Sequence, residues 1–253
     1  MSKIQFHLQG NFALITGGAS GIGLATSELL ARSGCKVAIN DVNANKLDTE
    51  INRLRSEGFD VRGFHQDIGS KENTETLVND ALDWLGNLDY LINNAGTPNT
   101  NKVIPASDLD RLDESFWQTI MSVNLMAPFW ITKQAAHALK ARHGSVVNTT
   151  STAAFFGGGS SLAYSVSKSA LVGLTRELAR GLAPAVRVNG IAPGVVNSDW
   201  QCRFDDREEH SENQVPLQRA GEPEDYAQTI VFLCAGGNYM TGEVVMVSGG
   251  LGI

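Results

Sequence analysis

The stretch "NFALITGGASGIG", residues 11–23, decides the fold of this chain. Its first half is an apolar run typical of a buried strand, and residues 22–33 then repeat apolar and small side chains at helical spacing. Between them lie Gly17, Gly21 and Gly23, in the spacing G-x-x-x-G-x-G. Glycines let the backbone approach a pyrophosphate closely, and the helix N-terminus offers it unpaired N–H groups. The context of strand, turn and helix therefore favours a dinucleotide site over an ordinary turn.

The next strand supports this interpretation. "KVAIND", residues 36–41, ends in Asp41, which comes about 20 positions after the glycine loop. An acidic residue at that place can accept hydrogen bonds from the adenosine ribose hydroxyls.

The same alternation continues along the chain. Further strands are expected within residues 60–67, 88–96, 144–151, 186–194 and 242–250, with helical segments between them. This pattern predicts an α/β Rossmann fold: a single domain over residues 1–253, doubly wound, with a seven-stranded parallel sheet and helices on both faces.

Composition excludes several classes of protein. The 253 residues are 42% hydrophobic and 19% charged, as in an ordinary globular protein, and the net charge is −7. Nucleic-acid binding is not expected, because it needs Lys and Arg to neutralise phosphates. No apolar run approaches the ~20 residues of a membrane span, and no signal peptide is evident. A cytoplasmic protein without a membrane partner is predicted.

Cysteine and histidine indicate neither disulfides nor a metal. Cys35, Cys202 and Cys234 are odd in number and far apart, so we interpret them as buried or incidental thiols in a reducing compartment. The five histidines show no metal-ligand spacing, so no metal is expected.

A second motif, "AYSVSK" at residues 163–168, places Tyr164 and Lys168 four positions apart, on one face of a helix. A lysine charge near a phenol favours the phenolate, which would make Tyr164 a usable general acid or base. A bare Tyr-x-x-x-Lys is more often a surface pair, so the interpretation needs support from elsewhere in the chain.

That support comes from a series of motifs in a fixed order. They are "TGGASGIG" at 16–23, "DI" at 67–68, "NNAG" at 93–96, Asn124 in "MSVNL", Ser151, "YSVSK" at 164–168, "PGVV" at 193–196 and "MTGEVVMVSGG" at 240–250. Together they resemble the short-chain dehydrogenase/reductase family, and the resemblance runs along nearly all of the chain.

The resemblance implies four catalytic residues. Tyr164 would exchange a proton with the substrate oxygen, and Ser151 would hydrogen-bond that oxygen. Lys168 would hold the nicotinamide ribose and bias Tyr164 towards ionisation, while Asn124 would anchor a water in the proton relay. The chemistry is consistent, since hydride transfer to a carbonyl builds negative charge on oxygen that preorganised donors must meet.

The resemblance also implies a set of contacts to the dinucleotide. The pyrophosphate would be held by the glycine loop (Gly17, Ser20, Gly21, Ile22, Gly23), and the adenine would be flanked by Asp67 and Ile68. The adenosine ribose and pyrophosphate would be lined by Asn94, Ala95 and Gly96. The nicotinamide would lie above Thr149 and be enclosed by Pro193, Gly194 and Val196. Ser198 stands where the family usually has threonine, and its hydroxyl is expected to keep the same contact. For Asp67 and Asn94, a turn residue that satisfies local backbone groups is an alternative interpretation that holds alongside.

The expected coenzyme is NAD(H). A carboxylate at Asp41 accepts the 2′-hydroxyl of NAD but repels the 2′-phosphate of NADP. The positions where NADP-binding relatives carry a cation hold Ser20, Val42 and Asn43, and Lys46 is expected to point to solvent.

The substrate site is expected at the carboxyl ends of the strands, under a lid formed by residues 197–215. Trp200 in the lid is a candidate substrate contact. Phe155 and Phe156 could line an apolar pocket or be ordinary core residues. The expected substrate is a partly apolar ketone or secondary alcohol.

Three functions compete: an NAD-dependent alcohol dehydrogenase or carbonyl reductase, a 3-oxoacyl thioester reductase, and a non-catalytic NAD-binding sensor. The resemblance implies a homotetramer, and apolar excess on the helix expected at 125–141 and on the C-terminal "VVMVSGGLGI" favours such an assembly.

Overall fold

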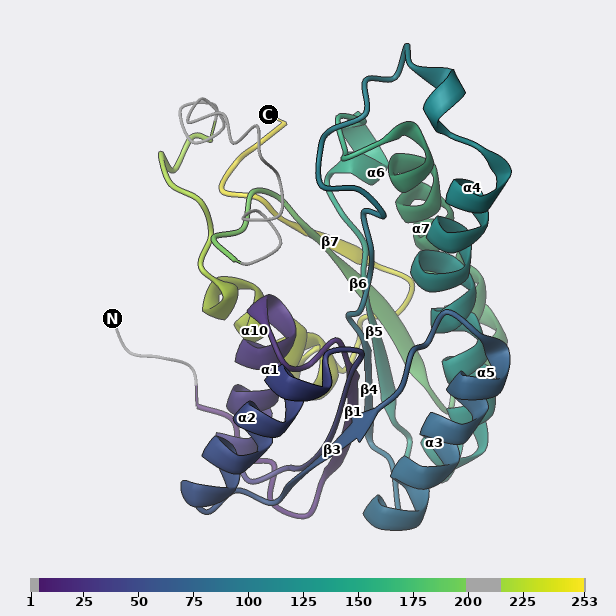
Figure 1. The fold of residues 1–253 in the computed structure, drawn as a ribbon. Helices are drawn as coiled ribbons and strands as arrows, with labels where there is room; N and C mark the ends of the chain where they lie inside the picture. Colours follow the sequence, from purple (N-terminus) through teal and green to yellow (C-terminus); the bar gives the residue numbers. More distant parts are fainter. Residues whose placement is uncertain (1–4, 199–214, 253) are drawn as a thin grey trace.

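The computed structural model describes residues 5–198 and 215–252. Within this part seven parallel strands form one sheet in the order β3-β2-β1-β4-β5-β6-β7 (Figure 1). The strands are β1 Phe12–Thr16, β2 Lys36–Asp41, β3 Val61–His65, β4 Tyr90–Asn93, β5 Ser145–Thr149, β6 Arg187–Pro193 and β7 Val244–Val247. The predicted doubly wound sheet is confirmed, and each strand lies inside its expected range.

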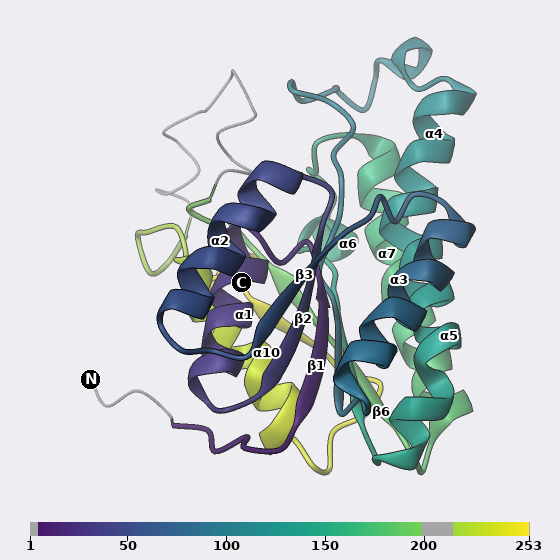
Figure 2. The same ribbon diagram turned by 60° about the horizontal axis from the view of Figure 1, so that its bottom comes forward.

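Helices cover both faces of the sheet (Figures 1 and 2). On one face lie α1 Gly21–Arg32, α2 Ala44–Ser56 and α10 Pro223–Val231; on the other lie α3 Lys71–Leu85, α5 Ala127–Ala141 and α7 Leu162–Leu182. Each face buries its own apolar cluster, the first centred on residues such as Leu30 and Ile230, the second on Leu77 and Ile131. Shorter elements are η1 Leu109–Arg111, α4 Glu114–Met121, η2 Ser122–Met126, α6 Ala153–Phe156 and η3 Phe232–Gly236.

The strand order predicts a crevice at the carboxyl ends of the neighbouring strands β1 and β4. β1 pairs with β2 on one side and with β4 on the other, so the connections that follow β1 and β4 leave in opposite directions. At the carboxyl ends of the strands this opens the place where ligands bind in sheets of this kind. The glycine loop, Asn94, Ser151 and Gly194 all follow strands at this edge.

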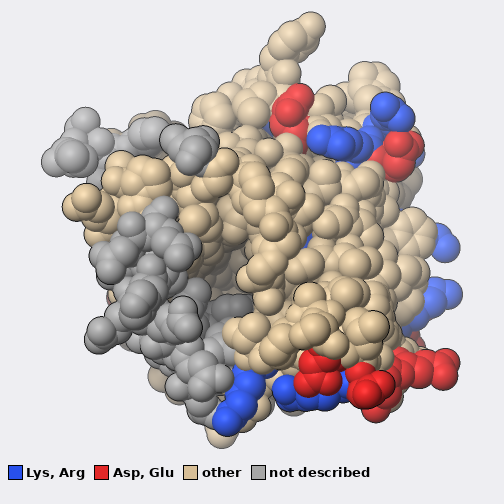
Figure 3. Space-filling view, turned by 90° about the horizontal axis from the view of Figure 1, so that it is seen from above, with Lys and Arg blue, Asp and Glu red and all other residues tan. Residues whose placement is uncertain are grey.

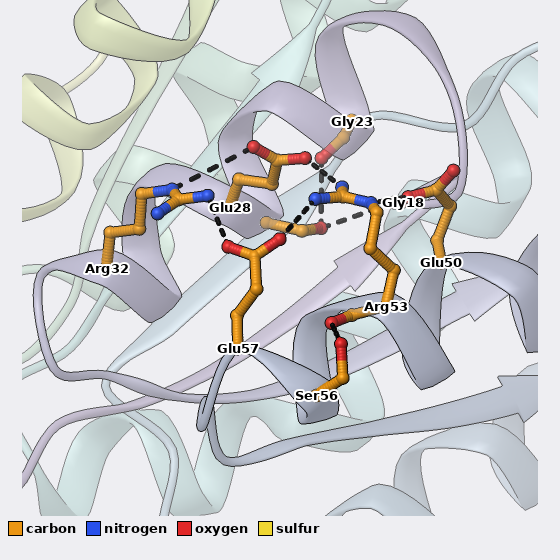
Figure 4. Close-up of polar contacts among 9 residues, drawn as sticks. Gly18, Gly23, Glu28, Arg32, Glu50, Arg53, Ser56 and Glu57 are labelled. Carbon is orange, nitrogen blue, oxygen red and sulfur yellow. Dashed lines mark hydrogen bonds and ion pairs between the residues drawn. The ribbon is translucent and has the colours of Figure 1, made fainter.

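Ion pairs join the two helices that flank the glycine loop (Figure 4). Arg53 of α2 contacts Glu28 of α1 as well as Glu50 and Glu57, and Arg32 of α1 contacts Glu57. These side chains are partly exposed, so each pair contributes on the order of 0.2–1 kcal/mol. The network ties the helix that begins at the glycine loop to the helix that follows Asp41.

The helix expected at 125–141 differs from the structure at its start. It is preceded by α4 and by a wide π turn, η2, in which Asn124 is buried. The π turn has no local sequence signal, because the Asn124 side chain is held there by hydrogen bonds to Thr97 and Ser167, which are distant in sequence.

Among the helices that the structure describes, none has the length and hydrophobicity needed to span a membrane.

Candidate active site

The glycine loop has no room for side chains at two of its three motif glycines. A Cβ on Gly17 would lie 2.9 Å from the Ala95 Cα, and Gly17 has a φ of +63°. A Cβ on Gly23 would lie 1.9 Å from the Gly17 carbonyl oxygen. Gly21 has a φ of +51° and lies beside Ser198. The loop therefore packs backbone against backbone, which is the close approach that a pyrophosphate cradle needs.

Asn94 fastens the end of β4 to this loop. Its Nδ2 donates to the carbonyl oxygens of Thr16 (3.2 Å) and Gly17 (3.1 Å). The Thr16 hydroxyl in turn accepts the backbone N–H groups of Asn94 and Ala95, each at 3.2 Å. The backbone-satisfying interpretation of Asn94 is confirmed, and its contact with a dinucleotide stays a prediction.

Asp41 stands at the rim of the glycine loop. Its two carboxylate oxygens accept the backbone N–H groups of Ala19 (3.1 Å) and Asn43 (2.9 Å), so the loop and the start of α2 fix its position. Lys46 is exposed, as expected, but it also lines a surface cavity of about 480 Å³ together with Ser20. A cation therefore lies nearer the loop than the sequence suggested.

The two residues expected to flank the adenine behave differently. Asp67 is exposed, and its carboxylate accepts the Gly69 N–H at 2.8 Å, as a turn residue does. Ile68 is buried in the core beside α3, so little of its side chain is available to a ligand.

Ser151, Tyr164 and Lys168 converge at the carboxyl end of β5. Tyr164 lies in the first turn of α7, where its backbone N–H is capped by the Ser161 hydroxyl at 3.1 Å. Its phenol is hydrogen-bonded to the Ser151 side chain. The Lys168 Nζ lies 5.8 Å from the centre of the Tyr164 ring and donates to the Thr149 carbonyl oxygen at 2.8 Å. The helical spacing and the strand end thus bring a phenol, a hydroxyl and an ammonium together.

Burial dominates the acid–base properties of this group. It raises the pKa of Tyr164 to about 12, and the hydrogen bond from Ser151 opposes that rise. It lowers the pKa of Lys168 to about 8. In the free protein the removal of the phenol from water outweighs any bias towards ionisation by Lys168, so the pKa of Tyr164 is raised. Tyr164 is therefore protonated at neutral pH, the state that donates a proton.

Lys168→Met is expected to stabilise the fold. Below pH 8 Lys168 is charged in both states, and the folded state bears the cost of burying the charge. Methionine removes that cost but also the bond to Thr149, so we expect a net gain of about 1–2 kcal/mol at pH 7. Between pH 8 and 10.5 the unfolded wild type binds more protons than the folded wild type, so the free energy of unfolding of the wild type rises with pH. The stability advantage of Lys168→Met therefore shrinks over this range. Urea unfolding of both proteins at pH 7 and pH 10.5 tests this, and a loss of stability at pH 7 would contradict it.

Asn124 completes the buried polar group. Its Oδ1 accepts the Thr97 N–H at 2.8 Å, and its Nδ2 donates to the Thr97 carbonyl oxygen at 3.0 Å. A Cβ on Gly96 would lie 3.3 Å from both the Asn124 Oδ1 and the Lys168 Nζ, so glycine keeps space between them. A water bound there is the relay that the resemblance implies, and it stays a prediction.

The remaining predicted contacts lie at the end of β6 and just after it. A Cβ on Gly194 would lie 2.9 Å from the Ser248 Cα, and the Pro193 carbonyl oxygen accepts the Thr152 N–H at 2.9 Å. Val196 pairs with Gly221, which holds the chain in place just before Ser198 reaches the glycine loop.

The substrate side is only partly described. Trp200 and most of the expected lid, residues 199–214, lie outside the described residues. Phe155 and Phe156 are 42% and 55% exposed, so the core interpretation is wrong for both. Figure 3 shows a hollow on this face of the molecule, and the described residues along its border are largely neither acidic nor basic.

Three neighbours of the site were not predicted. Thr97 binds Asn124 through its backbone, which leaves no sequence signal. Gly159 packs closely beside the Tyr164 ring, since a Cβ on Gly159 would lie 2.7 Å from the Tyr164 Cδ1. Ser161 could have been found, because a serine that begins a helical pattern is a common N-cap.

Comparisons with known proteins find relatives that match nearly the whole chain. A family model described as enoyl-(acyl carrier protein) reductase matches residues 17–252. The BbsD subunit of (2S)-[(R)-hydroxy(phenyl)methyl]succinyl-CoA dehydrogenase from Thauera aromatica is 35% identical, over 96% of this chain and 97% of its own. A 3-ketoacyl-(acyl-carrier-protein) reductase from Brucella melitensis, solved with NADH, is 26% identical with a TM-score of 0.88, covering 97% and 100%. A blue fluorescent protein from a metagenomic library, solved with NADPH, is 30% identical with a TM-score of 0.89, covering 98% and 100%.

Proposed function

The chain belongs to the short-chain dehydrogenase/reductase family, and from this premise we propose that it interconverts a secondary alcohol and a ketone with NAD(H). Membership makes it an oxidoreductase; the substrate class and the choice of NAD are our proposal. The observation that carries the proposal is the convergence of Ser151, Tyr164 and Lys168 at the carboxyl end of β5.

The protein's own groups suit carbonyl reduction. A bound reduced nicotinamide would supply the hydride, and negative charge would then develop on the carbonyl oxygen of the substrate. The Ser151 hydroxyl hydrogen-bonds that oxygen, and Tyr164 donates its phenolic proton to it. The Lys168 ammonium then stabilises the phenolate that is left, since an opposite charge favours the ionised form. In alcohol oxidation the same proton moves in the reverse direction.

The residues present fit a dinucleotide. Gly17 and Gly23 let the loop fold tightly against Ala95 and against itself at the N-terminus of α1, where backbone N–H groups could bind a pyrophosphate. Asp41 stands beside that loop, and Ser198 closes on it from the other side. In the proposed complex the glycine loop would hold the pyrophosphate, Asp41 the adenosine ribose and Lys168 the nicotinamide ribose.

A 3-oxoacyl thioester reductase is the second candidate. It is favoured by the names of two similar proteins, a coenzyme A thioester dehydrogenase and a ketoacyl-carrier reductase. It would use the same catalytic residues on a longer substrate. The net charge of −7 disfavours docking of an acidic carrier protein. A non-catalytic NAD sensor is disfavoured because a pure binder has no use for the buried proton donor.

A substrate panel tests the proposal. Purified protein is assayed with ketones, secondary alcohols and 3-oxoacyl thioesters, each with NAD(H) and NADP(H), by following the absorbance of the reduced coenzyme. We expect the highest kcat/KM with an apolar ketone or its alcohol. Higher kcat/KM with thioesters would favour the second candidate, and coenzyme binding without turnover of any compound would favour the sensor.

We also expect a homotetramer. In the described residues Phe232, Tyr239 and Met246 are large apolar or aromatic side chains exposed by more than a third, and Met246 lies on the edge strand β7. The apolar excess of α5 is partly accounted for by its packing against α3, so the support comes mainly from the C-terminal segment. Light scattering should give about four times the 27.1 kDa of one chain; a monomer at micromolar concentration would contradict the proposal.

A further inference from the structure

We propose that Ser167 is a positioning residue of the active site, which fixes the wide turn η2 and the loop after β4 against the catalytic end of α7. The inference rests on the proposed function, because it assigns Ser167 to the support of Tyr164, Lys168 and Asn124. Ser167 touches none of the reacting atoms.

Ser167 makes two hydrogen bonds from a fully buried position. Its Oγ donates to the Tyr164 carbonyl oxygen at 2.7 Å and accepts the Asn124 Nδ2 at 3.2 Å. One hydroxyl therefore joins the backbone of the proposed proton donor to the side chain at the centre of the π turn.

The connection continues beyond Asn124. The Asn124 side-chain amide forms two hydrogen bonds with the backbone of Thr97, which directly follows the "NNAG" segment. Consecutive hydrogen bonds thus connect three segments that are far apart in sequence: the loop after β4, η2 and α7. A Cβ on Gly96 would lie 3.3 Å from both the Asn124 Oδ1 and the Lys168 Nζ, so a shift of these hydrogen-bonded segments would change the space around the ammonium.

Removing the hydroxyl should loosen the π turn. A π turn is an uncommon, locally costly conformation that usually accompanies a functional site. Without Ser167 Oγ, Asn124 Nδ2 keeps only the Thr97 carbonyl oxygen, and the turn can relax towards ordinary helix. Displacement of reacting groups by about 1 Å can cost up to 100-fold in rate.

Thr175 offers a matched control on the same helix. It is also fully buried, its Oγ1 donates to the Leu171 carbonyl oxygen at 2.7 Å, and it accepts the Asn148 Nδ2 at 2.9 Å. Thr175→Val therefore removes the same pair of hydrogen bonds two turns away from the site. A purely structural role of buried hydroxyls would make the two variants alike.

The kinetic test compares Ser167→Ala, Ser167→Cys and Thr175→Val with wild type. We expect Ser167→Ala to lower kcat about five- to twenty-fold with the KM for NAD(H) unchanged within two-fold. Ser167→Cys should recover part of kcat, because a thiol keeps a weak donor and acceptor. Thr175→Val should lower Tm as much but leave kcat within about two-fold of wild type. Equal losses of kcat in Ser167→Ala and Thr175→Val, or none in Ser167→Ala, would overturn the proposal.

Hydrogen exchange provides a readout that does not depend on turnover. Ser167→Ala should speed amide exchange about ten-fold in peptides covering residues 94–97 and 122–126, because Thr97 N–H is held through Asn124. Thr175→Val should leave these peptides unchanged. If the wild type turns over no compound, the proposed function fails while this comparison still decides whether Ser167 holds the site together; unchanged exchange in Ser167→Ala would overturn it.

Discussion

Tyr164→Phe is expected to lower kcat by about 10²–10⁴-fold while NADH affinity changes by less than about two-fold, because the variant lacks the transferable proton but keeps the ring. The ring packs against Gly159, and the Ser161 cap binds the backbone of residue 164, so neither support depends on the phenol oxygen. Turnover is measured with the best substrate of the panel, and NADH affinity by fluorescence titration.

Tyr239→Phe is the matched control. Tyr239 is fully exposed in the single chain and is not one of the active-site residues, so losing its hydroxyl should change neither turnover nor affinity. Turnover of Tyr164→Phe within a few-fold of wild type would remove Tyr164 from the mechanism. A loss of NADH affinity as large as the loss of kcat would show that the variant disturbs the site as a whole.

The kcat of the wild type for carbonyl reduction is expected to fall at high pH. Burial holds the pKa of Tyr164 near 12, so Tyr164 stays protonated through the neutral range, and reduction should not lose its proton donor there. Lys168, with a pKa of about 8, loses its charge as the pH rises through that value. The phenolate formed during reduction then lacks its opposite charge, and kcat for reduction should fall above pH 8.

Much of this site could be predicted because its determinants are local in sequence. Gly17 and Gly23 are required by backbone contacts that leave no room for a Cβ, and Gly21 by its positive φ, so the glycine spacing is visible in the sequence. Tyr164 and Lys168 share a helix face, and the alternation of strands and helices fixes which edge of the sheet carries Ser151.

What could not be predicted depends on contacts between distant segments. At the π turn the Asn124 side chain is hydrogen-bonded to Thr97 and Ser167, and neither contact leaves a local pattern. The exposure of Phe155 and Phe156 follows from a short helix that turns outwards after β5, whereas their composition alone fits a core. The direction of the Tyr164 pKa depends on burial, which residue spacing does not report.

The choice of coenzyme is the second large effect, and it depends on Asp41. Both of its oxygens are already tethered to backbone N–H groups, at Ala19 and Asn43, so the carboxylate cannot swing away from an adenosine ribose bound beside the glycine loop. The 2′-phosphate of NADP would bring close to two further negative charges to it. Two unit charges ~4 Å apart interact by about 4 kcal/mol at an effective dielectric of 20. We therefore expect at least a ten-fold preference for NAD(H) in kcat/KM.

Asp41→Ser combined with Val42→Arg should relax or reverse this preference. The double change removes the repulsion and adds a cation at a position that is 64% exposed, so the arginine can be accommodated without repacking the core. Lys46→Met is the informative comparison, because Lys46 lines the cavity beside Ser20 and could attract a phosphate there. If Asp41 decides the choice, Lys46→Met leaves the wild-type ratio of kcat/KM for NADH over NADPH within a few-fold. Equal use of NADPH by the wild type, abolished in Lys46→Met, would mean that Lys46 reaches the phosphate and outweighs the carboxylate, and the assignment of Asp41 would fall.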